Sequence, residues 1–372
     1  MSKLKYKFYN LPKRRTLEDY EELARYLVDR YCRIKGLVSI YEWGDVSDPG
    51  ISDMDLIFVF KGKKADSMPL FKRGFYMLSR DRRYTARHPF FYIDGLSFRD
   101  IKYVYPEAAL KLLYGKDIRI KNISSKGLYF PKIALLNDII TRHYPRDFLE
   151  QSLKRSINVR DTLLRLNSLK YSIRTLEMLT KEKNRWNGKL KKIAFLRKNW
   201  FRRNNFESLI SCVNDATDIT MGLISGFRNF LIKNNFVKIK SGSCAEYNDR
   251  KNGALFVKNW SPENALKRMK DYPESRKDFC SVLPIELAPQ QIEYSRHEGR
   301  VSSHIKAHLK TDIKYELGYK KTAEKRIAVF NAQTELAAGL RHSDFAAFFD
   351  FGYRNRHGIN NAVFGMIRNL RN

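Results

Sequence analysis

The sequence predicts an α+β protein in which an N-terminal domain with a short mixed sheet precedes a large, mostly α-helical region. Over residues 16–130, apolar residues at helical spacing alternate with short runs of strand-forming residues. After Pro131 the pattern changes, because residues 133–179 contain no glycine and their apolar residues recur three or four positions apart. Both patterns occur in one chain, so the fold class combines a small sheet with packed helices.

The N-terminal domain is expected to open with a helix. Thr16 and Asp19 have the spacing of a capping box, and Gly36 is a natural helix stop. The apolar residues between them fall at helical spacing: Leu17, Tyr20, Leu23, Leu27 and Tyr31. The segment between the cap and the glycine is therefore predicted to be helical.

Three strands are expected next, at residues 37–43, 53–60 and 89–94, with a turn-rich loop at 44–52 between the first two. Residues 56–60 are continuously apolar, which is typical of a central strand that is buried on both faces. Short helices are expected at 70–79 and at 107–114. The second of these follows Pro106, which suits a first helical position, and it ends at Gly115.

Length and spacing suggest three domains. Residues 1–130 form the N-terminal α/β domain, 131–234 a basic helical domain, and 235–372 a mostly helical region that contains a small β-hairpin. The hairpin is expected over residues 235–258, and helices are expected to return from Pro284.

The chain is strongly basic, with 71 Lys and Arg against 40 Asp and Glu and a formal net charge of +31. Such an excess attracts polyanions, of which nucleic acid, nucleotides, acidic glycans and anionic membrane surfaces are all candidates. Apolar residues make up 43% of the chain, which argues against global disorder.

The four cysteines are far apart and lack the spacing of zinc ligands, so they are read as ordinary thiols in a reducing compartment. Residues 1–15 lack the apolar core of a signal peptide, and no apolar run approaches the roughly 20 residues that span a bilayer. A cytoplasmic protein without a transmembrane segment is expected.

The pair Asp53 and Asp55 stands at the head of the apolar strand. Residues two apart on a strand face the same side, so the two carboxylates should point into one space. Two acids so placed repel each other, but they suit a hard divalent cation. The alternative is a strand start with two solvated acids, and the buried character of residues 56–60 argues against it.

The turn at Gly44 and the stretch Ser52-Asp53-Met54-Asp55 together resemble the signature of the polymerase-beta nucleotidyltransferase superfamily. The resemblance covers residues 37–60 well and 61–130 loosely. It implies an Mg²⁺-dependent enzyme that moves a nucleoside monophosphate from an NTP to an acceptor hydroxyl. Two Mg²⁺ ions, with Mn²⁺ as the alternative, would clamp the attacking and leaving oxygens.

The resemblance also implies a nucleotide-binding role for the loop after the first strand, through Gly44, Asp45, Ser47 and Ser52. The family usually has serine or glycine after the turn glycine, whereas this chain has Asp45. Either Ser47 or Ser52 is then expected to supply the missing hydroxyl.

Members of the family usually carry a third carboxylate on a later strand, where it completes the metal site. Asp94, at the end of the strand 89–94, is the candidate for this metal ligand and catalytic acid, and Asp100 is the second choice. The alternative for Asp94 is a turn residue, since Asp94-Gly95 is a common turn dipeptide.

Basic residues in two places are candidates for binding the acceptor. One cluster lies between residues 80 and 87 and contains Arg80, Arg82, Arg83 and Arg87. The other lies in the cationic and aromatic segment 181–203 and includes Lys191, Lys192 and Arg197. Cations interleaved with aromatics suit phosphate and base contacts, although a solvated helix with its aromatics in the core has the same pattern.

The net charge favours a polyanionic acceptor such as RNA, and small metabolites, sugars and protein side chains remain open. The alternative function is a catalytically inactive nucleotidyltransferase-like module that binds nucleic acid or a protein partner.

Overall fold

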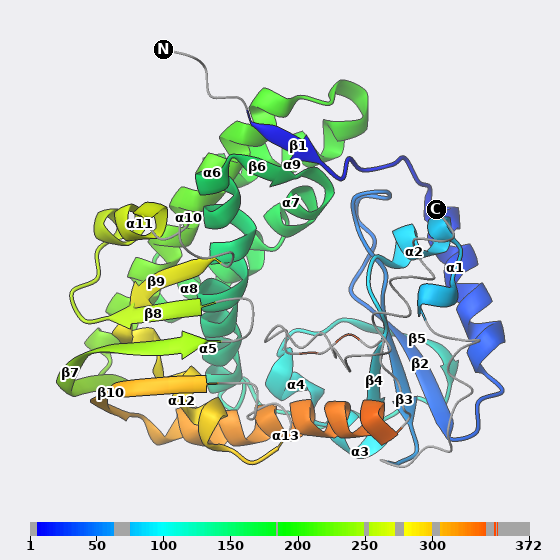
Figure 1. The fold of residues 1–372 in the computed structure, drawn as a ribbon. Coiled ribbons are helices and arrows are strands. Elements are labelled where there is room, and N and C mark those ends of the chain that lie inside the picture. Colours follow the sequence, from blue (N-terminus) through cyan, green and yellow to red (C-terminus); the bar gives the residue numbers. More distant parts are fainter. Residues whose placement is uncertain are drawn as a thin grey trace.

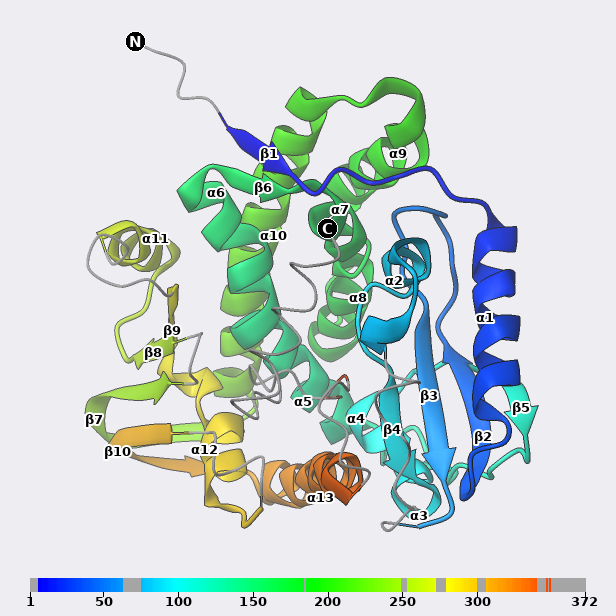
Figure 2. The ribbon, with the colours of Figure 1, turned by 45° about the vertical axis from the view of Figure 1, so that its right-hand side comes forward.

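The computed structural model describes residues 6–62, 75–183, 185–248, 253–271, 279–299, 306–339, 346 and 348. It confirms an α+β fold, with short sheets and a helix-rich remainder. Figures 1 and 2 show one sheet on each side of a group of long helices, and the helix α13 (Leu317–Gly339) runs along one end of the molecule from one sheet toward the other.

The N-terminal sheet has four strands in the order β4-β3-β2-β5. The strands are β2 (Leu37–Trp43), β3 (Asp55–Phe60), β4 (Phe91–Asp94) and β5 (Leu110–Gly115). Strand β3 pairs antiparallel with β2 and parallel with β4, so the expected central strand is confirmed.

The helix expected over 107–114 is wrong, because residues 110–115 form β5 and pair antiparallel with β2. The free edge of β2 offers backbone donors and acceptors to this segment, and long-range pairing overrides the local helix signals. The helix expected over 70–79 lies mostly outside the described residues; of the described part, Phe75–Met77 forms the 3₁₀ turn η2.

Each face of β3 packs against a different core. Helix α1 (Leu17–Tyr31) has the expected capping box at Thr16, and its buried face meets Leu56, Phe58 and Phe60. The alternate residues Ile57 and Val59 join the larger core, which continues into the helical region. Since Asp53 and Asp55 share the parity of Ile57, they lie on the face that is turned toward the helices.

Short helices link the strands of this sheet: α2 (Arg80–Ala86), α3 (Gly95–Phe98) and α4 (Ile101–Val104). The helical region then comprises α5 (Tyr129–Asp138), the π-helical segments η3 (Ile139–His143) and η4 (Pro145–Glu150), α6 (Gln151–Lys154), α7 (Val159–Leu166), α8 (Leu169–Thr180), α9 (Asn187–Arg203) and α10 (Phe206–Lys233). The start of the chain also lies on this region, because β1 (Lys7–Tyr9) pairs in parallel with β6 (Ser156–Asn158).

The C-terminal region contains a four-stranded sheet in the order β10-β7-β8-β9. Its elements are β7 (Val237–Asn248), β8 (Gly253–Val257), α11 (Pro262–Asp271), β9 (Cys280–Pro284), η5 (Ile285–Leu287), α12 (Pro289–Arg296) and β10 (Lys306–Tyr315). The hairpin of β7 and β8 is the one expected, but two further strands extend it. Strand β10 lies in the stretch for which helices were expected; it pairs with β7 from far along the chain, a partner that local periodicity does not reveal.

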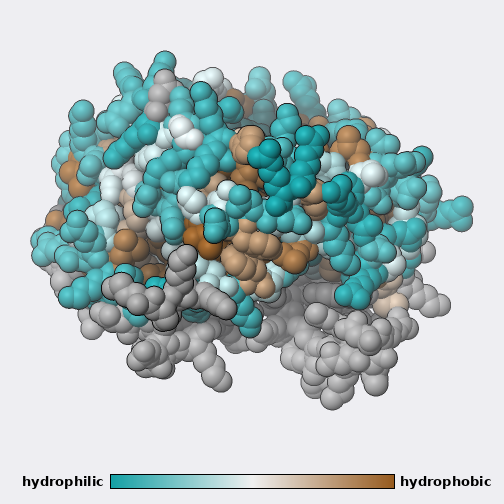
Figure 3. All heavy atoms as spheres, turned by 90° about the horizontal axis from the view of Figure 1, so that it is seen from above, coloured by the Kyte–Doolittle hydropathy of each residue, from teal (hydrophilic) through white to brown (hydrophobic). Residues whose placement is uncertain are grey.

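Within the part of the chain that the structure describes, no helix has both the length and the apolar character needed to cross a membrane. The face seen from above in Figure 3, on the side where α9 lies in Figure 1, is largely hydrophilic.

Candidate functional site

Asp53, Asp55 and His88 form a compact group at the head of β3. One ligand atom from each lies within 4.8 Å of the others. Nε2 of His88 is 2.7 Å from Oδ1 of Asp55 and 3.8 Å from Oδ2 of Asp53. All three side chains are partly buried, so the convergence of the two aspartates expected from their spacing is present in the structure.

The chain that leads into β3 is held firmly. The carbonyl oxygen of Ser52 accepts hydrogen bonds from the hydroxyl of Tyr20 at 2.6 Å and from Nη2 of Arg160, on α7, at 3.2 Å. On the other side, Asp55 is paired in register with Trp43 of β2. Two helices, α1 and α7, and the strand β2 therefore fix the backbone that carries the two aspartates.

A strained turn delivers His88 to this group. Arg87 has φ +64° and ψ −44°, and the backbone N–H of His88 donates to the carbonyl of Ala86 at 2.8 Å. These angles and this bond define a γ-turn with positive φ, a conformation that costs a non-glycine residue about 1–3 kcal/mol. Strain of this kind is retained where the surrounding structure needs the side-chain positions that it creates.

Parallel pairing brings the residues that precede β4 to the same edge of the sheet as those that precede β3, because Ile57 is paired with Phe91. The turn at Arg87, and not the alternation of a strand, then directs the ring of His88 to the two acids. Nδ1 of His88 lies 2.7 Å from the carbonyl oxygen of Pro89. A carbonyl only accepts, so Nδ1 carries the proton in this bond. Nε2 is then the nitrogen that faces the carboxylates, which is the usual arrangement of a metal-binding histidine.

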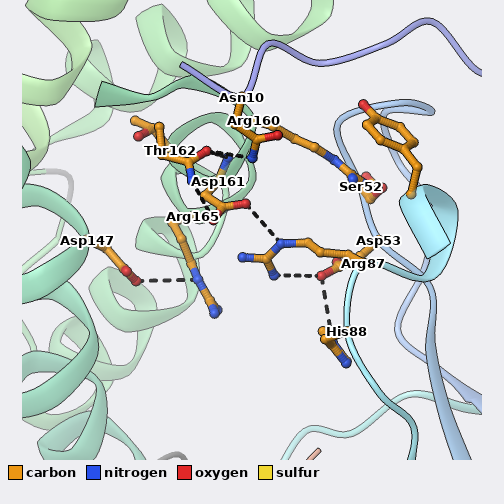
Figure 4. A network of polar contacts seen from close by, with 12 residues as sticks. Asn10, Ser52, Asp53, Arg87, His88, Asp147, Arg160, Asp161, Thr162 and Arg165 are labelled. Carbon is orange, nitrogen blue, oxygen red and sulfur yellow. Dashed lines mark hydrogen bonds and ion pairs between the residues drawn. The ribbon is translucent and has the colours of Figure 1, made fainter. Parts of the chain in front are cut away.

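Arg87 links the group to the helical region (Figure 4). Its Nη1 lies 2.9 Å from Oδ2 of Asp53, and its Nε lies 3.0 Å from Oδ1 of Asp161 on α7. Burial by itself raises the pKa of Asp53, but the positive charges of Arg87 and His88 outweigh it and hold this pKa below its usual value. Asp53 is therefore ionised and already paired with a cation.

The pKa of His88 moves the other way. Burial lowers it, but the neighbouring Asp55 and Asp53 outweigh burial and raise the pKa above its ordinary value. A cation that binds Nε2 has to displace the proton that these two carboxylates favour.

Asp94 is not the third carboxylate of this group, which corrects the expectation. It is paired with Phe60, at the opposite end of β3 from Asp55. Its Oδ1 accepts hydrogen bonds from the backbone N–H of Leu96 and Ser97, both at 3.0 Å, so the residue caps the short helix α3. The alternative interpretation of Asp94 as a local turn residue is the closer one.

Asp100, the second choice, lies 2.7 Å from Nζ of Lys121 and does not join the group either. The place expected for the third acid is taken by the pair Arg87 and His88.

The loop 44–52 does not have the features expected of a triphosphate cradle. Gly44 has φ +86°, which explains the glycine, but its N–H donates to the carbonyl of Ala109 at 2.9 Å. The hydroxyl of Ser52 is buried and accepts from the N–H of Asp48 at 3.1 Å. The N–H of Gly44 therefore ties the loop to the residue before β5, and the hydroxyl of Ser52 serves the loop itself, while Asp45 and Ser47 are exposed.

The residues predicted to bind the acceptor differ in how exposed they are. Arg80 and Arg82 are exposed on α2, where Arg82 lies over the ring of Tyr26 at 3.5 Å, and Arg83 is half-buried. Lys191 and Lys192 are exposed on α9, and Lys192 forms an ion pair with Asp215 at 2.7 Å.

Arg197 contradicts the expectation of an acceptor contact, because it is only 4% exposed. Its Nη2 lies 2.6 Å from Oδ2 of Asp48, so it fixes the loop 44–52 to α9.

Comparison with protein-family models, with curated proteins and with solved structures finds no match to this chain. The chemistry of the site therefore has to be argued from its own residues.

Sequence reasoning missed His88 and Asp161, and it placed Arg87 only within a basic cluster. The one local signal was the position of Arg87 and His88 directly before an apolar strand. A parallel neighbour of the Asp53 strand brings its own starting residues to the same edge of the sheet, but the sequence did not show that this strand was the neighbour.

Proposed function

We propose that the chain is a divalent-metal-dependent nucleotidyltransferase that moves a nucleoside monophosphate from an NTP to an acceptor hydroxyl. The observation that carries the proposal is the convergence of Asp53, Asp55 and His88 at the head of a buried strand. Arrays of this kind supply ligands for a cation that neutralises charge on a reacting phosphate. The resemblance of residues 37–60 to the nucleotidyltransferase signature supports this reaction class.

The donor set fits a divalent first-row ion. Oδ1 of Asp55 is buried and lies 2.7 Å from Nε2 of His88, so a cation that displaces the proton between them gains an oxygen and a nitrogen ligand together. Carboxylates suit both Mg²⁺ and Mn²⁺, whereas an imidazole favours first-row transition ions over Mg²⁺. We therefore expect Mn²⁺ to bind more tightly than Mg²⁺, and His88→Ala to remove most of this preference.

An anionic acceptor, for which RNA is the first candidate, is supported by the net charge of +31 and by the exposed cations of α9. We place this reaction in the cytoplasm, where NTPs and RNA are both available.

The test is pyrophosphate release from each of the four labelled NTPs with Mn²⁺ or Mg²⁺, with and without total RNA. Turnover in the wild type that is lost in Asp53→Ala and Asp55→Ala, but retained in Asp94→Asn, is the expected result. The labelled product identifies the acceptor. Turnover that persists in both alanine variants would refute the assignment of this group to catalysis.

A second function, a catalytically inactive module that binds nucleic acid or a protein partner, is favoured by two observations. Arg87 pairs with Oδ2 of Asp53, and among the described residues no third acid joins the group. Salt-sensitive RNA binding by a wild type that releases no pyrophosphate under any of these conditions would decide for this module.

A further inference from the structure

Asp161 and Arg165 stand one helical turn apart on α7, on the side that faces Asp53. Oδ1 of Asp161 accepts a hydrogen bond from Nε of Arg87 at 3.0 Å. Arg165 places its own Nε 3.4 Å from Oδ2 of Asp147, which lies in the π-helical segment η4. Figure 4 shows the side chain of Arg165 reaching from the helical side toward the ion pairs of Arg87.

A chain of ion pairs connects the part of α7 that carries Arg165 to the candidate metal group. Asp161 pairs with Nε of Arg87, and Nη1 of Arg87 pairs with Oδ2 of Asp53. The side chain of Arg165 is 34% exposed, and among the described residues only its Nε is engaged. Its terminal nitrogens make no hydrogen bond or ion pair within the described structure, so they can still donate to an anion.

The loop after β2 offers little to a phosphate. The N–H of Gly44 and the hydroxyl of Ser52 are both engaged, and Asp45 adds a negative charge. A triphosphate beside Asp53 and Asp55 therefore needs cationic donors from another part of the chain. The guanidinium of arginine suits this need, because its planar fork matches phosphate oxygens in a two-bond contact.

We propose that Arg165 binds the phosphate chain of the nucleotide from the helical side. This inference rests on the proposed function and identifies which residue holds its substrate. Asp147 is a positioning residue, since it holds Nε of Arg165 and leaves the terminal nitrogens to the ligand. The phosphates are thereby bound between the sheet that carries Asp53 and the helix α7.

The experiment is a calorimetric titration of the full chain with inorganic tripolyphosphate in the presence of Mn²⁺. Arg165→Ala is expected to weaken binding about tenfold or more, because hydrogen bonds to a charged group are lost. Arg165→Lys keeps the charge but loses the planar fork, so an intermediate affinity is expected. Arg174→Ala, which removes an exposed charge from α8, is the matched control and should stay within about twofold of the wild type.

Thermal unfolding should be alike in all four proteins. Mn²⁺ binding without phosphate is measured in each of them, so that a change at the metal group is not counted as a change in phosphate binding. If Arg165→Ala is misfolded, the tripolyphosphate affinity of Arg165→Lys tests the proposal, and a loss relative to the wild type supports it. The proposal is overturned if the wild type does not bind tripolyphosphate, if the Arg165 variants bind it as tightly as the wild type does, or if Arg174→Ala loses as much affinity as Arg165→Ala.

Binding of tripolyphosphate requires no turnover, so the two proposals fail separately. A wild type that binds it through Arg165, yet releases no pyrophosphate from any NTP, refutes nucleotide transfer and leaves the phosphate site standing.

Discussion

Arg87 donates to Asp53 over 2.9 Å while its own backbone is held at φ +64°. The residue that neutralises one candidate ligand is thus also the centre of the turn that brings in another, His88. The ion pair and the strain of the turn can be separated by two substitutions. Alanine removes only the ion pairs, whereas glycine removes them and also relaxes the strain.

Replacing Arg87 by alanine or by glycine should therefore lower the free energy of unfolding by different amounts. Both Arg87→Ala and Arg87→Gly lose the ion pairs with Asp53 and Asp161, which costs about 2–3 kcal/mol for charged hydrogen bonds. Glycine tolerates positive φ, so the glycine variant is expected to be more stable than the alanine variant by about 1 kcal/mol. Urea denaturation measures the difference, and an alanine variant as stable as the glycine variant would contradict the strain.

The same two variants should bind Mn²⁺ more tightly than the wild type, because Arg87 no longer competes for Oδ2 of Asp53. The measurement is a Mn²⁺ titration followed by electron paramagnetic resonance. Unchanged or weaker Mn²⁺ binding would show that Arg87 supports the site instead of blocking it.

Asp94 should matter for stability and not for metal binding. Asp94→Ala loses both cap bonds to α3 and is expected to destabilise the protein by about 1–2 kcal/mol. Asp94→Asn keeps an acceptor oxygen and should lose less. Mn²⁺ affinity is expected to stay at the wild-type value in both, in contrast to Asp53→Ala; a parallel loss in Asp94→Asn would restore Asp94 to the site.

Arg326 of α13 should be the most sensitive cation in the described structure. It is 1% exposed, pairs with Asp138 at 2.6 Å and donates to the carbonyls of Tyr103 and Val104. Arg326→Met leaves Asp138 buried without its partner, which costs about 3–5 kcal/mol. Lys325→Met, on the exposed side of the same helix, should change the stability by about 0.5 kcal/mol or less.

Two glycines should respond differently to alanine. A Cβ at Gly44 would meet nothing within 4 Å. Gly44→Ala is therefore expected to lower the free energy of unfolding only through the positive φ, by about 1–2 kcal/mol. A Cβ at Gly115 would lie 2.0 Å from the carbonyl oxygen of Val38, so Gly115→Ala must also move backbone and should be clearly the less stable variant. Chemical denaturation of both variants gives the comparison, and equal losses would contradict it.

Some features were predictable because they depend on neighbours in the sequence. The capping box at Thr16 was correct, since a cap involves residues three apart. The helix expected over 107–114 was wrong, because the edge of β2 decides the state of residues 110–115. Asp94 was misjudged for a related reason: its distance from Asp55 depends on the register of β4 against β3.

The sequence by itself determined that Asp53 and Asp55 share one face of a buried strand. That relation follows from the two-residue period of a strand and from the apolar run behind the pair. Only the tertiary structure decided what meets these acids. Parallel pairing brings the start of β4 to the same edge of the sheet, and the turn at Arg87 directs both Arg87 and His88 to the acids. The packing of α7 sets Asp161 and Arg165 opposite. These partners lie more than thirty residues away along the chain, so packing, and not any local pattern, creates the contacts.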